Sequence, residues 1–460
     1  MLVVAWAGLA ATPAQAQGNA DWPAYLFDTG HSSYNAAATS IGTGNVANLQ
    51  QVWQFGTNQT FRASPTVVGG VVYIGAESGT FYAISEATRA VLWSRNLGFV
   101  PALTCGRMGI IATATVVNDP VTGLTVYVNA PDGQLYALAA ATGAIRWHST
   151  VDKPSTTVND YYAWGSPLVA NGHVYVGISS ECDNPLVPAG VREFNQDTGA
   201  RQGFWHSLPN GQAGASVWST PAESTLGDGS VFATTGNAPG TTQPANAESI
   251  VRLSGTNLSL LDSWQVPASQ QSRDGDFGAS PTIFTADLNG TTTAMVGACN
   301  KNGIYYAFRQ RALHAGPVWQ QRIAAPSGQT HPTGQCDAAA IWDGTHLIEA
   351  GGNSTVIKGV TYQGSVQSLN PATGAPIWQT GLPGQLIGSP TEDGAGVVAA
   401  PVFRSTTGNL GVYLLSTATG AILNYISTST SGIFSQPVFA GNDLLVAGAK
   451  TFGLKAYAVP

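Results

Sequence analysis

Residues 63–84, ASPTVVGGVVYIGAESGTFYAI, contain one unit of a repeat that recurs along almost the whole chain. A Ser-Pro pair opens the unit, and apolar runs follow, separated by Gly-Gly and by Glu-Ser-Gly. Short apolar runs between such turns are typical of antiparallel hairpins. The unit therefore predicts strands at 66–68, 71–75 and 81–84, followed by a fourth strand that carries Trp93.

A Ser/Thr-Pro pair opens most copies of the repeat. The pair returns at intervals of roughly 45–60 residues, the length of one supersecondary unit in a repeat fold. Gln436-Pro437 is a degraded copy, and Thr115-Val116 and Ala339-Ala340 fill the two gaps. Eight such inner strands predict an all-β fold, an eight-bladed β-propeller of four-stranded antiparallel blades. The intact pairs are Ser64-Pro65, Ser166-Pro167, Thr220-Pro221, Ser280-Pro281 and Ser389-Pro390.

A second signature, Ala-Thr-Gly followed by Trp, marks the turn into the fourth strand of a blade. It reads Ala141-Thr142-Gly143 to Trp147, and Ala372-Thr373-Gly374 to Trp378. A large amphipathic ring buries much area while its N–H finds a carbonyl. We therefore expect these tryptophans to pack between blades.

The ring is expected to close on the N-terminal part of the chain. The last blade has too few strands after Pro437, whereas Leu49–Phe55 alternates as a strand does. We predict that 49–55 supplies the missing strand. This would join both ends of the chain in one domain, 17–460, and remove an open sheet edge.

Composition favours an exported, turn-rich protein. Of 460 residues, 55 are Gly and only 9% are charged, and a net charge of −7 without a basic cluster argues against nucleic acid. Residues 1–16 are apolar and end in Ala-Gln-Ala, which predicts a signal peptide. Its positive n-region is missing, so we expect a longer signal peptide, with an N-terminal anchor as the alternative. No later apolar run reaches the roughly 18 residues of a spanning helix. We predict a periplasmic or extracellular location.

The chain has four cysteines and no C-x-x-C motif, which argues against a zinc knuckle or c-type haem. In an exported protein they are expected to form two disulfides. Three connectivities are possible. We favour Cys105–Cys182 and Cys299–Cys336, because each pair falls on comparable loops of neighbouring blades.

The residue two positions before each Ser/Thr-Pro pair is expected to face the central channel, because the innermost strand of a blade lines the axis. This ring is rich in aromatic side chains and has one cation, so it suits a flat aromatic ligand. The alternative is that the aromatic side chains plug a narrow channel. The ring consists of Arg62, Thr113, Trp164, Trp218, Gly278, Ile387 and Phe434.

Several polar residues lie close to the same inner strands. They are Glu181, Asn237, Asp274, Asp276 and Lys301. Carboxylate and amide oxygens around a channel are ligands for a hard cation such as Ca²⁺. The alternative for each residue is an ordinary turn, since Asn-Gly and Asp-Gly are common in hairpin loops.

From Asp21-Trp22-Pro23 to its C-terminus the chain resembles the pyrroloquinoline quinone (PQQ) propeller superfamily. This superfamily includes the quinoprotein alcohol dehydrogenases and polyvinyl-alcohol dehydrogenase-like proteins. Ala215-Ser216-Val217-Trp218 resembles the segment whose Trp forms the floor under the quinone. Thr234-Thr235-Gly236-Asn237 resembles the segment whose Asn binds Ca²⁺, and Glu181 lies close to the family's Glu ligand.

Two further motifs are similar to the family's catalytic segments. Asp276-Phe277 resembles an Asp-aromatic pair whose Asp, also placed among the metal ligands here, is the general base. Asn300-Lys301-Asn302-Gly303 resembles the strand whose Lys contacts the quinone carbonyls. These motifs follow one another in the family's order.

The chain departs from the family pattern at four further predicted cofactor contacts. A single Cys105, before Gly106-Arg107, stands where the family has two adjacent cysteines. Arg62 replaces an acidic residue, and Trp164 replaces a small hydroxyl residue. We also expect no cytochrome domain.

The resemblance implies a dehydrogenase that uses PQQ and Ca²⁺ to oxidise a small or polymeric alcohol and passes electrons to an external acceptor. Asp276 would take the hydroxyl proton. The alternative, shared with non-catalytic propellers such as the outer-membrane assembly lipoproteins, is a scaffold that binds proteins or a surface.

Overall fold

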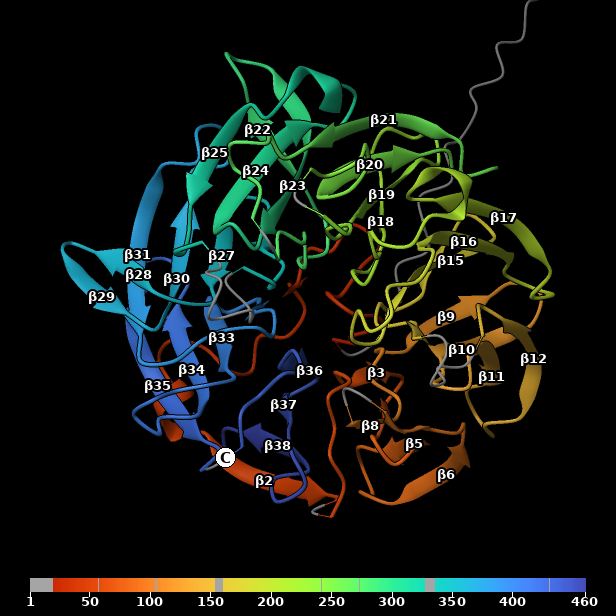
Figure 1. Cartoon of the computed structure of the whole chain (residues 1–460). Coiled ribbons are helices and arrows are strands. Elements are labelled where there is room, and N and C mark those ends of the chain that lie inside the picture. Colours follow the sequence, from red (N-terminus) through yellow and green to blue (C-terminus); the bar gives the residue numbers. More distant parts are fainter. Residues whose placement is uncertain are drawn as a thin grey trace, which may run out of the picture.

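The computed structural model describes residues 20–56, 58–103, 106–153, 160–240, 242–272, 274–326, 336–429 and 431–460. Eight four-stranded antiparallel sheets follow one another around a central axis (Figure 1). The predicted eight-bladed propeller is therefore confirmed. The predicted signal peptide, 1–16, lies outside the described residues, and the domain limits 17–460 stay a prediction.

Blades 1 to 4 take up the first half of the ring. Their strands are β3 (Thr66–Val68), β4 (Val71–Gly75), β5 (Thr80–Ser85) and β6 (Val91–Asn96); β9 (Thr115–Asp119), β10 (Gly123–Asn129), β11 (Gln134–Ala139) and β12 (Ile145–Thr150); β14 (Leu168–Ala170), β15 (His173–Ser180), β16 (Gly190–Asn195) and β17 (Arg201–His206); and β18 (Ala222–Glu223), β19 (Val231–Thr234), β20 (Ser249–Leu253) and β21 (Leu260–Gln265).

Blades 5 to 8 complete it. Their strands are β22 (Thr282–Asp287), β23 (Thr292–Asn300), β24 (Ile304–Arg309) and β25 (Trp319–Arg322); β26 (Ile341–Trp342), β27 (Leu347–Gly351), β30 (Gly364–Leu369) and β31 (Pro376–Leu382); β32 (Thr391–Asp393), β33 (Val397–Val402), β34 (Gly411–Ser416) and β35 (Ile422–Ser427); and β36 (Val438–Ala440), β37 (Asp443–Ala447), β38 (Leu454–Ala458) and β2 (Gln50–Phe55).

Small additions decorate the blades. The hairpins β7 (Val100–Leu103)–β8 (Gly106–Met108) and β28 (Thr355–Ile357)–β29 (Val360–Tyr362) extend two loops. Strand β13 (Tyr161–Tyr162) pairs with β15, and β1 (Tyr34–Asn35) pairs with β32. Three single 3₁₀ turns are η1 (Val46–Asn48), η2 (Pro209–Gly211) and η3 (Leu313–Ala315). Within the described residues, no helix has the length and apolar character needed to cross a membrane.

The ring closes as the sequence predicts. Strand β2 pairs antiparallel with β38, in a register that places Gln50 opposite Ala458 and Phe55 opposite Leu454. The outermost strand of blade 8 thus comes from the N-terminal part of the chain (Figure 1). This pairing gives the last blade its fourth strand.

The hydroxyl groups of the Ser/Thr-Pro motif accept hydrogen bonds from neighbouring blades near the axis. The backbone N–H of Ser166 donates to Thr220 Oγ1 at 2.9 Å, and that of Thr220 donates to Ser280 Oγ at 2.9 Å. The N–H of Gln436 donates to Ser64 Oγ at 2.9 Å, across the closure of the ring. Hydroxyl side chains at this position therefore link the inner strands of neighbouring blades and satisfy buried N–H groups.

The Ala-Thr-Gly and Trp motifs meet at the rim of the propeller. Trp319 of blade 5 lies against Gly374 in the turn of blade 6, and its Nε1–H donates to the Pro371 carbonyl at 2.8 Å. Three other interfaces repeat the contact, with the acceptor three residues before the glycine: Trp93 with Gly143, Trp147 with Gly199 and Trp378 with Gly420. The predicted packing of these tryptophans between blades is confirmed.

At the closing interface an arginine takes the place of the glycine. Arg89 has a φ of 61° and its guanidinium lies 5.6 Å from the centre of the Trp53 ring of β2. It also forms an ion pair with Asp443 of blade 8, at 3.4 Å.

The N-terminal segment 20–35 runs through the centre of the ring, along the inner edges of the blades (Figure 1, red). Its carbonyls accept hydrogen bonds from the inner edges of most blades. The donors are the backbone N–H groups of Val67, Val116, Glu223, Ile283, Trp342, Glu392 and Gly441, at 2.7–3.0 Å. The segment thereby satisfies inner-strand N–H groups that would otherwise lack partners. Its Tyr25 hydroxyl contacts Ser389 Oγ at 3.1 Å.

Candidate functional site

A cavity of about 80 Å³ lies on the propeller axis. All seven residues that the sequence predicts to face the channel line it, from Arg62 to Phe434. Asp337 lines it from blade 6, and Tyr25 lines it from the N-terminal segment. The predicted ring thus surrounds a cavity at the channel.

Lys301 lies between two carboxylates just after β23. Its Nζ donates to Asp276 Oδ2 at 2.6 Å and to Asp274 Oδ1 at 2.8 Å. Burial opposes its charge, but Asp276, Asp337 and Asp274 hold the pKa of Lys301 above its usual value. The Nζ also lies 5.2 Å from the centre of the Trp218 ring, within the range of a cation–π contact. Lys301 therefore stays charged next to the cavity wall that Trp218 forms.

Asp276 is held on both of its carboxylate oxygens. The backbone N–H of Asn237 donates to Asp276 Oδ1 at 2.8 Å, and Lys301 takes Oδ2. Gly236 permits this approach, because a Cβ there would collide with Asp276 Oδ1. Asn237, Asp276 and Lys301, which the sequence places in separate motifs, are thus neighbours in the structure.

Asp337 lies where blade 6 reaches the axis. A Cβ on Gly278 would collide with both Asp337 Oδ1 and the Trp218 ring. The glycine therefore allows both side chains to pack against its backbone. Asp337 Oδ1 is buried and accepts no hydrogen bond from the described residues. Burial, and repulsion from Asp274 and Asp276, raise the pKa of Asp337 to about 6.

Within the described residues, several carboxyl groups surround Lys301. Burial first, and then Asp276 and Asp274, raise the pKa of Glu248 to about 8. Glu248 is fully buried, and its carboxyl lies directly under Gly275. Asp183 is also raised to a pKa of about 6, by burial and by Asp276. Among the described residues, Lys301 is the lysine that neighbours Asp183, Asp274, Asp276 and Asp337, so these acidic groups favour a further positive charge.

Glu181 comes from the loop after β15 in blade 3. It is 4% exposed, its backbone N–H donates to the Asp160 carbonyl at 2.5 Å, and its charge raises the pKa of the buried Tyr162. The same loop carries Asp183, which interacts electrostatically with Asp276 and Lys301. The loop therefore lies beside the carboxylate cluster, while the role of Glu181 as a metal ligand stays a prediction.

Two of the residues that depart from the family pattern lie at the cavity. Trp164 and Arg62 both line the cavity. Trp164 donates from Nε1 to the Ser180 carbonyl at 3.0 Å, and Arg62 forms an ion pair with Glu77. Arg107 belongs to β8, and Cys105 lies outside the described residues.

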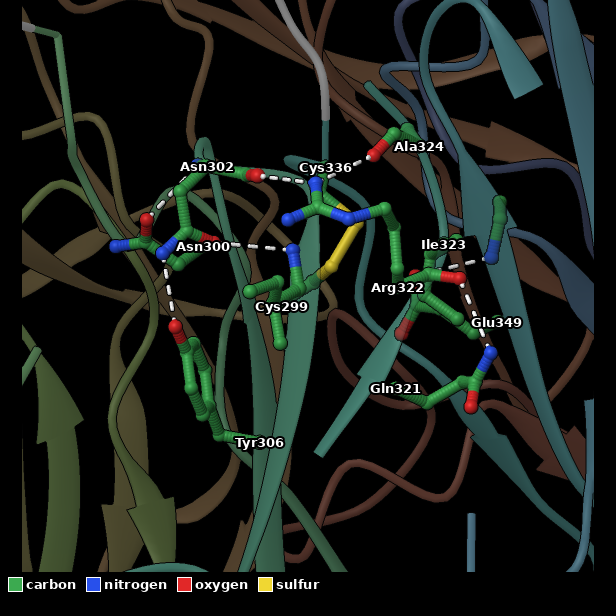
Figure 2. Close-up of a disulfide and its surroundings, with 12 residues drawn as sticks. Cys299, Asn300, Asn302, Tyr306, Gln321, Arg322, Ile323, Ala324, Cys336 and Glu349 are labelled. Carbon is green, nitrogen blue, oxygen red and sulfur yellow. Dashed lines mark hydrogen bonds between the residues drawn. A yellow bond between two sulfur atoms is a disulfide. The ribbon is translucent and has the colours of Figure 1, made fainter. Parts of the chain in front are cut away.

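One predicted disulfide is present, between Cys299 and Cys336, with Cα atoms 5.4 Å apart (Figure 2). The other pairing, Cys105–Cys182, stays a prediction because Cys105 is not described. Glu349 lies beside the bridge, and burial raises its pKa well above its usual value. Among the described residues, these two sulfurs and the Glu349 oxygen are the one set of His, Cys, Asp and Glu atoms with metal-ligand spacing. Because the sulfurs are bonded to each other, this cluster is a disulfide site.

Sequence reasoning missed three acidic residues of the site, Asp183, Glu248 and Asp337. Asp337 stands two positions before Ala339, so counting back in blade 6 as in the other blades would have found it. Glu248 and Asp183 have left-handed backbone, with φ of 45° and 58°, which turns them out of the regular strand pattern. No periodicity marks such positions.

The family described as outer membrane protein assembly factor BamB matches residues 38–159 and 104–336, together more than half of the chain. The chain belongs to this family of PQQ-type β-propellers. Two kinds of relative stand within this superfamily. The quinohemoprotein alcohol dehydrogenase of Comamonas testosteroni is 30% identical over 196 residues, 41% of this chain and 26% of that protein. The outer membrane protein assembly factor BamB of Burkholderia pseudomallei (strain K96243) is 24% identical over 416 residues, 87% of this chain and 86% of that protein.

A solved structure shares the whole architecture. A europium-containing methanol dehydrogenase superposes with a TM-score of 0.78 at 16% identity and covers 96% of this chain and 99% of that one. At this identity the likeness concerns the fold alone. The matches to curated alcohol dehydrogenases span about a quarter of the length of those proteins.

Proposed function

We propose that this propeller is a quinoprotein dehydrogenase that oxidises an alcohol with PQQ and Ca²⁺. The observation that carries the proposal is that Lys301 contacts both Asp276 and the ring of Trp218, which lines the cavity, although Trp218 precedes blade 4 and the other two residues belong to blade 5. Blade packing alone does not require this meeting, because the fold depends on rim and inner-strand contacts elsewhere. The match to quinoprotein alcohol dehydrogenases supports the same class.

The residues fit the proposed cofactors. Trp218 contributes an aromatic side chain to the cavity wall, and Asp337 offers a buried oxygen that accepts no hydrogen bond from the described residues. The excess of carboxyl groups around Lys301 favours a divalent cation, which would offset their mutual repulsion. Glu181, Asn237 and Asp276 are the proposed ligands of that cation.

When bound, the cofactors supply the acceptor for the two electrons and two protons that an alcohol loses on becoming a carbonyl compound, and a cation that stabilises developing negative charge. Asp276 would be the carboxylate that takes the hydroxyl proton. Lys301 keeps one oxygen of Asp276 fixed, and Asn237 N–H fixes the other. An external acceptor must then remove the electrons.

The test is reconstitution of the purified chain with PQQ and CaCl₂. We expect stoichiometric, Ca²⁺-dependent binding in calorimetry, a quinone absorption band, and alcohol-dependent reduction of an artificial acceptor. Absence of binding with Ca²⁺ and with other divalent and trivalent cations would refute the proposal.

A second candidate is a non-catalytic scaffold. It is favoured by the BamB relative, which aligns over almost the full length of both chains. A scaffold has no need of the charged cluster at the cavity, so Asp276→Asn and Lys301→Met should leave its partner binding unchanged. Under the dehydrogenase proposal the same variants lose turnover.

A further inference from the structure

The Cys299–Cys336 disulfide, shown in Figure 2, joins two segments that each continue to a residue of the site. Cys299 is the second-last residue of β23, and Lys301 follows two residues later. Cys336 directly precedes Asp337. The two sulfurs, 37 residues apart in sequence, therefore cross-link blade 5 at Lys301 to the entry of blade 6 at Asp337.

The Lys301 side of this bridge is firmly anchored. Asn300 Nδ2 donates to the Gly275 carbonyl at 2.6 Å, and Asn302 N–H donates to Asn300 Oδ1 at 2.9 Å. The Asn302 amide also reaches the Tyr306 hydroxyl at 2.8 Å, and Arg322 Nη1 donates to the Asn302 carbonyl at 3.1 Å (Figure 2). These bonds fix the turn that presents Lys301, independently of the disulfide.

On the Asp337 side, the described residues provide few other anchors. Within the part of the chain that the structure describes, the first backbone hydrogen bond after Cys336 is that from Ala339 N–H to Ser389 Oγ, at 2.9 Å. Asp337 itself occupies an unfavourable position. It is buried and its Oδ1 accepts no hydrogen bond from the described residues; Lys301 attracts it, but Asp274 and Asp276 repel it. Such a position persists only where the surrounding structure enforces it.

We propose that the Cys299–Cys336 disulfide is a positioning element of the cavity, which holds the Asp337 carboxyl beside Lys301 and Trp218 as a contact for the planar ligand. The ligand part of this inference rests on the proposed function. Asp337 Oδ1 accepts a hydrogen bond from an N–H or O–H in the plane of that ligand. The affinity of the cavity for its ligand then depends on the oxidised state of the bridge.

The first experiment is a mutant cycle on PQQ affinity, measured by calorimetry with CaCl₂ present. Asp337→Ala and the double variant Cys299→Ala/Cys336→Ala should each weaken binding about 10-fold, the value of one hydrogen bond to a charged group. Adding Asp337→Ala to the double cysteine variant should not weaken PQQ binding further, because loss of the disulfide has already displaced Asp337. If the effects of the two changes multiply instead, the disulfide does not act through Asp337.

Glu349→Gln is the matched control. Glu349 lies beside the same two sulfurs but does not line the cavity. Glu349→Gln should leave PQQ affinity within about twofold of wild type. If it lowers PQQ affinity as much as loss of the disulfide does, the disulfide has only a general packing role and the proposal is overturned.

The second experiment needs no ligand, so it separates this proposal from the proposed function. In hydrogen exchange of the ligand-free protein, loss of the disulfide should raise exchange in 337–342 about 10-fold and leave 302–309 unchanged. Unchanged exchange in 337–342 overturns the positioning role, whatever PQQ does. If wild type binds no PQQ while 337–342 loosens as expected, the proposed function fails and the positioning role stands. Should the alanine pair not fold, Cys299→Val/Cys336→Ala, which fills more of the vacated space, serves in its place.

Discussion

The rim and the axis of this propeller use the same repeat in opposite ways. At the rim, one contact recurs: a Trp covers the glycine of the next blade and donates to the carbonyl three residues before it. At the axis, the equivalent position carries a different side chain in almost every blade, from Arg62 and Thr113 through Trp218 and Asp337 to Phe434. The chain keeps its symmetry where the symmetry builds the fold and abandons it where the side chains surround a cavity.

Because of this difference, changes at the two places should have separable effects. A substitution at the rim should lower stability and spare ligand binding, and a substitution at the axis should do the reverse. Four experiments test or refine this separation, beginning with the largest expected effect.

Asp276→Asn should abolish most turnover while the protein stays folded. The amide keeps the shape and the hydrogen bond from Asn237 but cannot take a proton, so we expect kcat to fall about 100- to 10,000-fold. Turnover of the reconstituted enzyme and thermal unfolding would be measured together. Asp274→Asn is the matched control, since it also contacts Lys301. Equal losses in both variants would mean that the charge around Lys301 matters, rather than a base at Asp276.

His31 should make stability depend on pH, although it lies at the axis. Its ring nitrogen Nδ1 contacts the Pro281 carbonyl at 2.8 Å, and burial lowers the pKa of His31 to about 4, below an ordinary value near 6.5. As the pH falls from 6.5 towards 4, His31 binds a proton in the unfolded chain but stays neutral in the folded protein. The free energy of unfolding should therefore decrease on acidification, by roughly 3 kcal/mol at most.

Urea unfolding between pH 7 and 4.5 would measure this effect. His31→Asn should reduce the change in the free energy of unfolding between pH 7 and 4.5. Substitution of the exposed His148 by Asn should leave this change as in wild type. A wild-type slope that survives in His31→Asn would assign the acid sensitivity to other groups.

Gly374→Ala should test the rim. Gly374 has a φ of 72°, and a Cβ there would collide with the Trp319 ring. Gly408 has a similar φ of 78° but open space around it. Both substitutions incur backbone strain, so Gly374→Ala should lower the free energy of unfolding by about 1–3 kcal/mol more than Gly408→Ala, because of overpacking alone. PQQ affinity should be the same in both, and a change there would break the separation between rim and axis.

Trp218→Ala should test the aromatic wall of the cavity. We expect PQQ affinity about 10-fold lower, the value of one aromatic stacking contact, with little change in the melting temperature. Trp164→Ala removes the other tryptophan of the cavity and shows which ring carries the contact. If only Trp164→Ala weakens binding, the floor of the ligand site is on blade 3 rather than between blades 3 and 4.

Much of this organisation is readable from sequence, because the features that repeat are local. Ser/Thr-Pro and Ala-Thr-Gly occur near fixed points of each blade, and counting back from the first motif identifies seven residues of the cavity wall. The closing strand 50–55 is also predicted, since its alternation completes a blade that lacks one.

The charge network at the site could not be read in the same way. Lys301 contacts Asp274 and Asp276 from the next turn of blade 5, and Glu248 reaches them from blade 4. The contact of Lys301 depends on how two turns of blade 5 meet, and that of Glu248 on how blades 4 and 5 pack; no local pattern records either. Asp337 was missed for a different reason: blade 6 has Ala338-Ala339-Ala340 where other blades have Ser-Pro, so its inner strand is poorly marked.

The N-terminal segment 20–35 carries a consequence for the order in which the protein assembles. Its carbonyls bind N–H groups as distant in sequence as Val67 and Gly441, and the next strand, β2, pairs with β38. A ribosome makes this segment before any blade exists, yet its partners are complete only when the last blade has been made. Such long-range contacts form late and slowly. The segment that is synthesised first therefore completes its contacts last. In a chain that lacks the last blade, this segment and β2 cannot form all of their hydrogen bonds.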